Sequence, residues 1–323
     1  MSEDETTRTE PSVAELSYEE RISSEAAKWG SHLQVEAAGE WNAWLDHPLV
    51  NAHYDQRSLI DGVRWETWVS TVFGGPAERS LDLGCGSGGR SFAVFRAGGS
   101  AWIEGADVSP ERIAEAERLR TAAGIPGEFR VEDSNVSALP PNRYDLIFSA
   151  HSFHHFLELE HVMTEVCRAL TPRGLFILEE FVGPTQFQWT DAQLNFVNAL
   201  LSALPESFRE LPKGRVWPPG AVKTIEGRPT PEEVMQASPF ESIRSADILP
   251  LFEQYFEIVH LRRLGGTLQH LIYNGIMHNF AMHAPGSAGF IEGIFGVEDA
   301  LIDSELLPSD FMLLVGRPRS CMR

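Results

Sequence analysis

The chain has 323 residues, of which 43% are apolar and 22% charged, proportions that are ordinary for a globular protein in water. Its formal net charge of −20 argues against a nucleic-acid partner, because a phosphate backbone is bound by clustered Lys and Arg. No apolar run approaches the roughly 18 residues that span a bilayer, and the three cysteines fit no zinc-site spacing. We therefore expect a cytoplasmic protein whose partners include neither nucleic acid nor membrane.

The first 75 residues are predicted to lie outside the main domain. Residues 1–15 are rich in Glu, Ser and Thr, which predicts a disordered acidic tail. Residues 16–75 have a helical pattern, and we interpret them as an N-terminal helical lid. Large aromatic side chains usually fill cores, so we expect most tryptophans of this segment to pack and one or two to line a cavity. These tryptophans are Trp29, Trp41, Trp44, Trp65 and Trp68.

From Arg79 onward, short apolar strands alternate with amphipathic helices, a pattern typical of a parallel α/β sheet. We predict one doubly wound, mostly parallel, seven-stranded Rossmann-like sheet within 76–323, with 183–250 and 264–308 as insertions around an acceptor pocket. The predicted strands are 80–83, 101–107, 128–131, 144–148, 174–178, 255–261 and 311–315. The predicted helices are 89–96, 109–124, 159–170, 191–204 and 269–284.

The most informative segment is the run LDLGCGSGG at 81–89, which joins the first strand to the following helix. A glycine loop at such a junction lets backbone N–H groups approach a ligand. Gly84, Gly86 and Gly89 also satisfy the dinucleotide pattern, so the loop alone permits NAD or FAD. Asp82 favours a ligand with a cationic group, because a carboxylate in a buried strand needs a nearby cation and would repel dinucleotide phosphates.

This run resembles the first motif of the class I S-adenosylmethionine (SAM)-dependent methyltransferases. Further segments match that family in order and spacing, and Arg173 stands where the family more often has Gly. They are GADVSP at 105–110, VEDS at 131–134, RYDLIFS at 143–149 and LTPRG at 170–174. The resemblance implies that Asp107 binds the ribose hydroxyls and Asp133 the adenine amino group. The SAM site that it implies consists of Asp82, Gly84, Cys85, Gly86, Asp107, Val108, Asp133, Ser134 and Ser149.

Groups that could move a proton follow the fourth and fifth strands. His154 and His155 lie in the run HSFHHF, and a histidine near neutral pH is suited to proton abstraction. Of Glu179 and Glu180, one should face the site and the other a helix, because side chains alternate along a strand. We predict His154, His155 and Glu180 as catalytic residues, with helix capping or packing as the alternative. No carboxylate cluster accompanies the histidines of 151–161, so no metal site is predicted.

These observations predict transfer of a methyl group from SAM to an oxygen or nitrogen of a small organic molecule, such as a specialised metabolite or a sugar. The acidic composition and the large insertions favour this acceptor class over RNA or DNA. Three alternatives stay open: a protein or tRNA methyltransferase, a SAM-binding partner protein without catalysis, and an NAD-dependent oxidoreductase with the same glycine loop.

Overall fold

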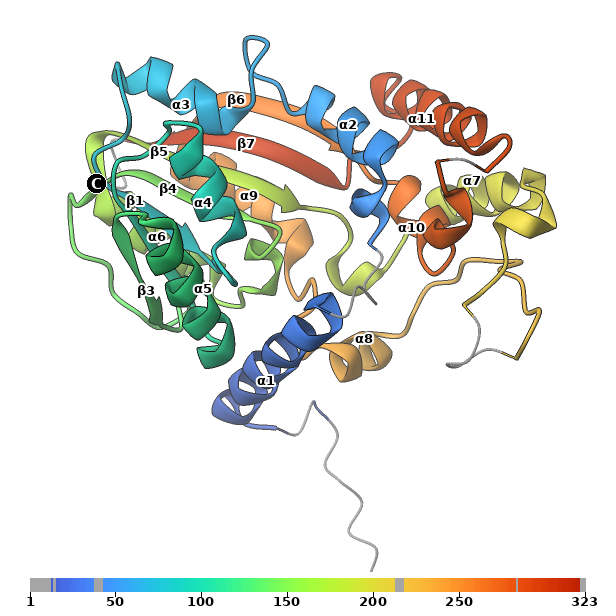
Figure 1. Ribbon diagram of the computed structural model, residues 1–323, viewed down its shortest axis with the longest axis horizontal. Coiled ribbons are helices and arrows are strands. Elements are labelled where there is room, and N and C mark those ends of the chain that lie inside the picture. Colours follow the sequence, from blue (N-terminus) through green and yellow to red (C-terminus); the bar gives the residue numbers. More distant parts are fainter. Residues whose placement is uncertain (1–12, 14–15, 38–42, 213–217, 283, 320–323) are drawn as a thin grey trace, which may run out of the picture.

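The computed structural model describes residues 13, 16–37, 43–212, 218–282 and 284–319 (Figure 1). Its seven strands form one sheet in the order β3-β2-β1-β4-β5-β7-β6, in which β7 runs antiparallel to both of its neighbours. The predicted doubly wound, mostly parallel sheet is therefore confirmed. The strands are β1 (Ser80–Leu83), β2 (Ile103–Asp107), β3 (Gly127–Val131), β4 (Tyr144–Ala150), β5 (Leu170–Phe181), β6 (Phe256–Gly265) and β7 (Phe311–Pro318).

Strand β5 is longer than its sequence predicts. Tyr144 of β4 pairs with Leu170, whereas Leu146 pairs with Leu175, so the residues between these pairs bulge out of the ladder. The segment LTPRG at 170–174, expected as a turn before the strand, is this bulge. A proline cannot donate to a sheet ladder, which is why the pairing is interrupted where Pro172 lies.

Helices cover both faces of the sheet. The central strands carry apolar side chains on each face, and these must be shielded from water. In β5, Leu175 and Ile177 belong to one hydrophobic core and Phe176 and Leu178 to the other. The first core includes side chains of α2 (Pro48–Arg57), α3 (Trp65–Phe73), α4 (Gly89–Arg96) and α5 (Pro110–Ala123). The second includes side chains of α6 (Leu159–Ala169) and α9 (Ser245–Tyr255).

The C-terminal half departs most from prediction. The single helix expected over 269–284 is wrong: α10 (Gln269–Tyr273) ends before Gly275, whose φ of 76° breaks it, and a 3-10 turn follows at Met277–Phe280. Helix α7 (Asp191–Ala203) was predicted, whereas α8 (Pro231–Ala237), α9 and α11 (Ser287–Asp303) were not. Proline inside α9 and glycines inside α11 lower helix propensity, so tertiary packing decides these helices.

Helix α1 (Tyr18–Ala37) lies apart from the sheet layers, beside α8 in Figure 1. The guanidinium of Arg21 donates to the carbonyl oxygen of Pro239 (2.9 Å), and Arg112 of α5 donates to that of Trp29 (2.8 Å). Helix α1 is thus tied to two elements at the carboxyl edge of the sheet. The predicted tail 1–15, apart from Val13, and Trp41 lie outside the described residues. In the described part of the chain, no helix combines the length and apolarity needed to cross a bilayer.

Candidate active site

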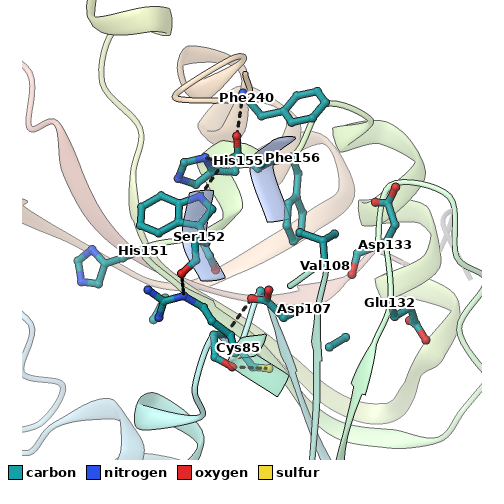
Figure 2. Close-up of a pocket in the computed structure, with 18 of the residues that line it drawn as sticks. Cys85, Asp107, Val108, Glu132, Asp133, His151, Ser152, His155, Phe156 and Phe240 are labelled. Atoms are coloured by element: carbon teal, nitrogen blue, oxygen red, sulfur yellow. Dashed lines mark hydrogen bonds and ion pairs between the residues drawn. The ribbon is translucent and has the colours of Figure 1, made fainter. Parts of the chain in front are cut away.

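A cavity of about 410 Å³ lies at the carboxyl ends of β1, β2 and β4 (Figure 2). The loops after these strands and after β3 form its floor, and α1 together with Phe240 covers it. Figure 2 shows Glu132 and Asp133 on one side of the cavity and His151 on the other. Among its lining residues are Ile22, Glu25, Trp29, Gly84, Cys85, Gly86, Ser87, Arg90, Asp107, Val108, Arg112, Asp133, Ser134, His151, Ser152, His155 and Phe156.

The glycine loop after β1 shapes the floor of this cavity. Gly84, Gly86 and Gly88 have φ values of 70°, 52° and 83°, in the left-handed region that other residues avoid. A Cβ on Gly84 would lie 2.5 Å from Ser152 Oγ, so the loop and the strand β4 end can approach this closely only with glycine there. Ser87 Oγ is buried at the cavity wall without a hydrogen-bond partner, which leaves a polar group available to a ligand.

Asp107 and Asp133, the two acids assigned to ribose and adenine, both line the cavity. Asp107 accepts hydrogen bonds from the backbone N–H groups of Gly86 and Ser109, each at 2.9 Å. Burial raises the pKa of Asp107, and these two N–H groups counteract the rise. Asp133 accepts from the hydroxyl of Tyr18 (2.7 Å) and from the backbone N–H of Asn135 (2.9 Å). Both carboxylates are therefore fixed in orientation before any ligand arrives.

Asp82 and Ser149 lie beneath the floor and do not line the cavity. Asp82 is 1% exposed and accepts a hydrogen bond from Ser91 Oγ at 2.6 Å. Its burial raises its pKa to about 7, although Ser91 and Arg90 act in the opposite direction. Ser149 Oγ donates to the carbonyl oxygen of Leu83 at 2.8 Å. Both side chains support the loop from below, and their contact with a cofactor stays a prediction.

Glu179 and Glu180 point to opposite faces of the sheet, as the alternation along β5 predicts. On the first face Glu179 accepts from Trp65 Nε1 (2.7 Å) and from Arg90 (3.0 Å), and its Oε1 lies 3.6 Å from His151 Nε2. Burial alone would raise the pKa of Glu179, but Arg90 and His151 hold it well below its ordinary value. His151 has a φ of 55°, which is rare for a residue with a side chain. The ionised Glu179 thus stands behind a histidine that faces the cavity.

On the second face Glu180 is fully buried against the 3-10 turn Phe153–His155. It accepts from the backbone N–H groups of Ser152 (2.8 Å) and Phe153 (2.6 Å), and it contacts His154 Nδ1 at 2.5 Å. Burial alone would lower the pKa of His154, but Glu180 and Glu241 raise it to about 10. Neither His154 nor Glu180 lines the cavity, whereas His155 does. Of the three residues predicted as catalytic, only His155 reaches the cavity wall.

Several cavity residues carry no recognisable motif. Trp29 comes from α1, whose Tyr18 also donates to Asp133 of the cavity, and Phe240 comes from the proline-rich stretch. Both stretches were expected to form a lid without named contacts. Trp29 also packs edge-on against His155, with ring centres 5.3 Å apart. His151 lies in the same run HSFHHF as the predicted His154 and His155, and the sequence analysis names no role for it. A signal for it exists: it is the first side chain beyond β4, where ligands of such sheets bind.

An aromatic enclosure, which we define as the rings around His270, lies beyond His151. The ring of His270 has the ring centres of five aromatic side chains within 6.1 Å. Burial lowers the pKa of His270 to about 4, so this imidazole is neutral, and its Nδ1 has no hydrogen-bond partner. The hydroxyl of Tyr54 is also buried and unpartnered. The five rings are those of Trp44, Phe181, Phe187, Trp189 and Phe311.

The polar groups of the cavity fit SAM better than a dinucleotide. SAM has a cationic amino acid part, whereas NAD and FAD have two phosphates. Four carboxylates and two guanidinium groups line the cavity, so negative side chains predominate. The unpartnered Ser87 Oγ and the two oriented acids supply hydrogen-bonding groups for an amino acid, a ribose and an adenine. The carboxylates are Glu25, Asp107, Glu132 and Asp133, and the guanidinium groups are Arg90 and Arg112.

Comparison with known proteins finds methyltransferases among the relatives of this chain. A family model described as a methyltransferase domain matches residues 75–237, about half of the chain. The demethylmenaquinone methyltransferase of Thermus thermophilus is 27% identical over 176 residues, which cover 52% of this chain and 76% of that protein. Squalene methyltransferase 1 of Botryococcus braunii is 32% identical over 114 residues, 35% of this chain and 30% of that protein. The ubiquinone biosynthesis O-methyltransferase of Rhizobium etli is 31% identical over 100 residues, 31% of this chain and 40% of that protein.

The chain therefore spans three quarters of the Thermus relative and less than half of the other two. A solved SAM-dependent methyltransferase from Mesorhizobium loti is 20% identical, covers 80% of this chain and 99% of its own, and has a TM-score of 0.42. The family model includes the glycine loop, Asp107, Asp133 and the histidines after β4. By its family match and by the architecture of its sheet, this chain belongs to the class I SAM-dependent methyltransferases.

Proposed function

We propose that this chain transfers the methyl group of SAM to an oxygen or nitrogen of a small, largely apolar molecule. The observation that carries the proposal is the position of His151 between the cavity and the aromatic enclosure. His151 lines the cavity, and its ring centre lies 6.0 Å from that of Tyr54 and 5.9 Å from that of Phe311. A base at this junction is near both a donor in the cavity and an acceptor among the rings.

The cofactor contacts that we propose use oxygens with free lone pairs. Bound SAM supplies a methyl group that its positive sulfur already activates, so the protein must hold the acceptor in line and exclude water. Each oxygen of Asp107 accepts one backbone N–H and keeps a lone pair for a ribose hydroxyl. Tyr18 and Asn135 hold Asp133 for the adenine amino group. Trp29 of α1 covers the cavity and keeps solvent from it.

We assign His151 as the general base, with Glu179 as its positioning residue. The Glu179 carboxylate stays ionised, because Arg90 lies 3.0 Å from it, and its Oε1 lies 3.6 Å from His151 Nε2, where it orients the imidazole. His151 can therefore take a proton from a hydroxyl or ammonium group while the methyl group is transferred. His155 contacts the same cavity and remains a candidate for holding the acceptor. His154 and Glu180 act as positioning residues behind the turn that follows β4.

The aromatic enclosure favours an apolar acceptor with one polar group. Its rings offer stacking surfaces, and the unpartnered Tyr54 hydroxyl and His270 Nδ1 offer hydrogen bonds. Relatives of this chain are named for demethylmenaquinone, squalene and ubiquinone biosynthesis, all of which involve apolar molecules. We therefore propose phenols and hydroquinones as the first acceptors to test, ahead of sugars. A protein or tRNA acceptor is disfavoured by the net charge of −20 and by the cover formed by α1.

The test is a methyl-transfer assay with the full chain, labelled SAM and a panel of phenols, hydroquinones, amines, sugars, tRNA and a protein mixture. We expect label to appear in one or more small apolar acceptors. The variant His151→Asn should lose most of that transfer and still bind SAM in calorimetry. The matched control is His278→Asn. His278 is exposed and does not line the cavity, so this variant should retain transfer.

Two results would count against this proposal. Transfer of the label only to tRNA or protein would show that the acceptor is a macromolecule and not a small apolar molecule. Tight SAM binding without transfer to any member of a broad panel would favour a SAM-binding partner protein that lacks catalysis.

A further inference from the structure

Two neighbouring histidines and one distant carboxylate converge next to the cavity. His154 and His155 lie in the 3-10 turn after β4, and Glu241 lies between α8 and α9. One ligand atom from each of these three side chains lies within 4.8 Å of the other two. All three side chains are partly buried, with 12%, 13% and 17% of their surface exposed. The sequence predicted no metal site, because Glu241 is far from the histidines along the chain.

Each histidine is oriented by a carboxylate at its Nδ1 atom. His154 Nδ1 lies 2.5 Å from Glu180 Oε1, and His155 Nδ1 lies 3.0 Å from Glu25 Oε1. The His155 contact has a hydrogen-bond distance without hydrogen-bond geometry. Glu25 is itself fixed, because it accepts from Trp29 Nε1 (2.6 Å). A metal-binding histidine usually has such a carboxylate on the ring nitrogen that does not bind the metal.

The remaining nitrogen of each ring faces the Glu241 carboxylate. His154 Nε2 lies 3.5 Å from Glu241 Oε1, and His155 Nε2 lies 4.0 Å from Glu241 Oε2. The first distance is at the outer limit of a hydrogen bond, and the second lies beyond it. Two ligands that each lie roughly 2.0–2.2 Å from a zinc ion are separated by about 3–4 Å. The spacing therefore suits a shared cation better than direct bonding.

We propose that His154 Nε2, His155 Nε2 and the Glu241 carboxylate bind one divalent transition-metal cation of the zinc type. Two imidazoles and one carboxylate are a ligand set for zinc or iron(II), and they leave further coordination positions for water or an acceptor oxygen. The site adjoins the proposed acceptor region, because His155 and Phe240, the neighbour of Glu241, both line the cavity. The inference rests on the geometry of these side chains and holds whichever acceptor the enzyme uses.

The charges around the site favour a cation. Three carboxylates, Glu25, Glu180 and Glu241, surround the two imidazoles, and among these groups Lys28 supplies a single ammonium 3.9 Å from Glu241. A dication bound here would displace the proton of His154 and take over the neutralisation of these carboxylates. It would also join the turn after β4 to the segment that carries Glu241 and, through Glu25, to α1. Metal binding should therefore stabilise the closed cover of the cavity.

The direct test uses the full chain, freed of metal by a chelator and then titrated with Co²⁺ and Zn²⁺. Co²⁺ bound by two imidazoles and a carboxylate absorbs visible light, and this readout needs neither SAM nor an acceptor. We expect one Co²⁺ for each chain, displaced by Zn²⁺, and no binding of Mg²⁺ at the same concentration.

The variants His154→Ala and Glu241→Gln should lose the absorption. Glu180→Gln, which leaves all three proposed ligands in place and alters the carboxylate behind His154, should weaken Zn²⁺ binding about 10- to 100-fold. His278→Ala is the histidine control and should bind as the parent chain does.

Circular dichroism and SAM binding by calorimetry establish that each variant is folded. A parent chain without Co²⁺ absorption would overturn the proposal and leave an ion-paired cluster of histidines and carboxylates. Absorption that survives in folded Glu241→Gln would overturn it as well. A parent chain that shows the Co²⁺ spectrum but transfers no methyl group to any acceptor of the panel would contradict the proposed function. The proposed metal site would still be supported.

Discussion

Two adjacent carboxylates, Glu179 and Glu180, divide the region beyond β5 into two different environments. Glu179 stands behind His151, which faces the cavity and the aromatic enclosure. Glu180 is buried under the turn Phe153–His155, where it accepts backbone N–H groups and orients His154. The chemistry of the two pairs is alike, but only the first pair includes a histidine that lines the cavity. Exposure to the cavity, more than residue type, separates the proposed base from the positioning residue.

The largest effect that we expect on turnover is on the Glu179 side. His151→Asn removes the proposed base, and loss of a general base costs about 10²- to 10⁴-fold in rate. Affinity for SAM should stay within a few fold, because Asp107 and Asp133 are unchanged. Steady-state kinetics with an active acceptor and calorimetry with SAM measure the two quantities. A kcat within threefold of the parent value would show that His151 is not the general base. His155, the other histidine that lines the cavity, would then be the next candidate.

The largest effect on stability is expected on the Glu180 side. Glu180→Gln replaces an ion that accepts from the N–H groups of Ser152, Phe153 and Phe181 at 2.6–2.8 Å in a fully buried position. Hydrogen bonds to a buried charge are worth more than neutral ones, and we expect the free energy of unfolding to fall by about 3 kcal/mol. Urea unfolding with a chelator present measures this without any metal contribution. A change below about 0.5 kcal/mol, which is typical of substitutions at surface sites, would show that the buried charge is dispensable.

The pH dependence of stability should distinguish the Glu179 side further. The pKa of Glu179 is lowered in the folded chain, so its contribution to stability is fully present above its ordinary value of 4.5 and is lost as the pH falls below that value. Glu179→Gln should therefore be less stable than the parent chain near neutral pH. The difference should shrink as the pH falls below about 4.5. Urea unfolding of both chains over this range measures it, and a constant difference would show that the ionised form of Glu179 contributes nothing.

The sequence was most informative where local pattern and fold coincide. The glycine loop, Asp107 and Asp133 sit at strand ends, so their meeting at one edge follows from a parallel sheet. By contrast, Glu25, Phe240 and Glu241 reach the cavity or its histidines from the N-terminal helix and the proline-rich stretch. No periodicity links these segments, because tertiary contacts alone bring them together. The same reason explains why the sequence predicted His154 and not His151. Neighbouring residues in the sequence do not show whether a loop histidine is buried or faces the cavity.

The smallest effect that we expect concerns the cover shared by both environments. Tyr18→Phe removes one hydroxyl, which donates to Asp133 Oδ2 at 2.7 Å, and leaves the ring that packs near Phe240 in place. One such hydrogen bond is worth about 0.5–1.5 kcal/mol, so SAM affinity should fall about 2- to 10-fold. The effect should appear mainly as faster SAM release, since α1 must move for the cofactor to leave and this bond helps to hold it. Stopped-flow release of SAM measures the rate. An unchanged release rate would mean that Arg112, through its bond to the carbonyl oxygen of Trp29, holds α1 without help from Tyr18.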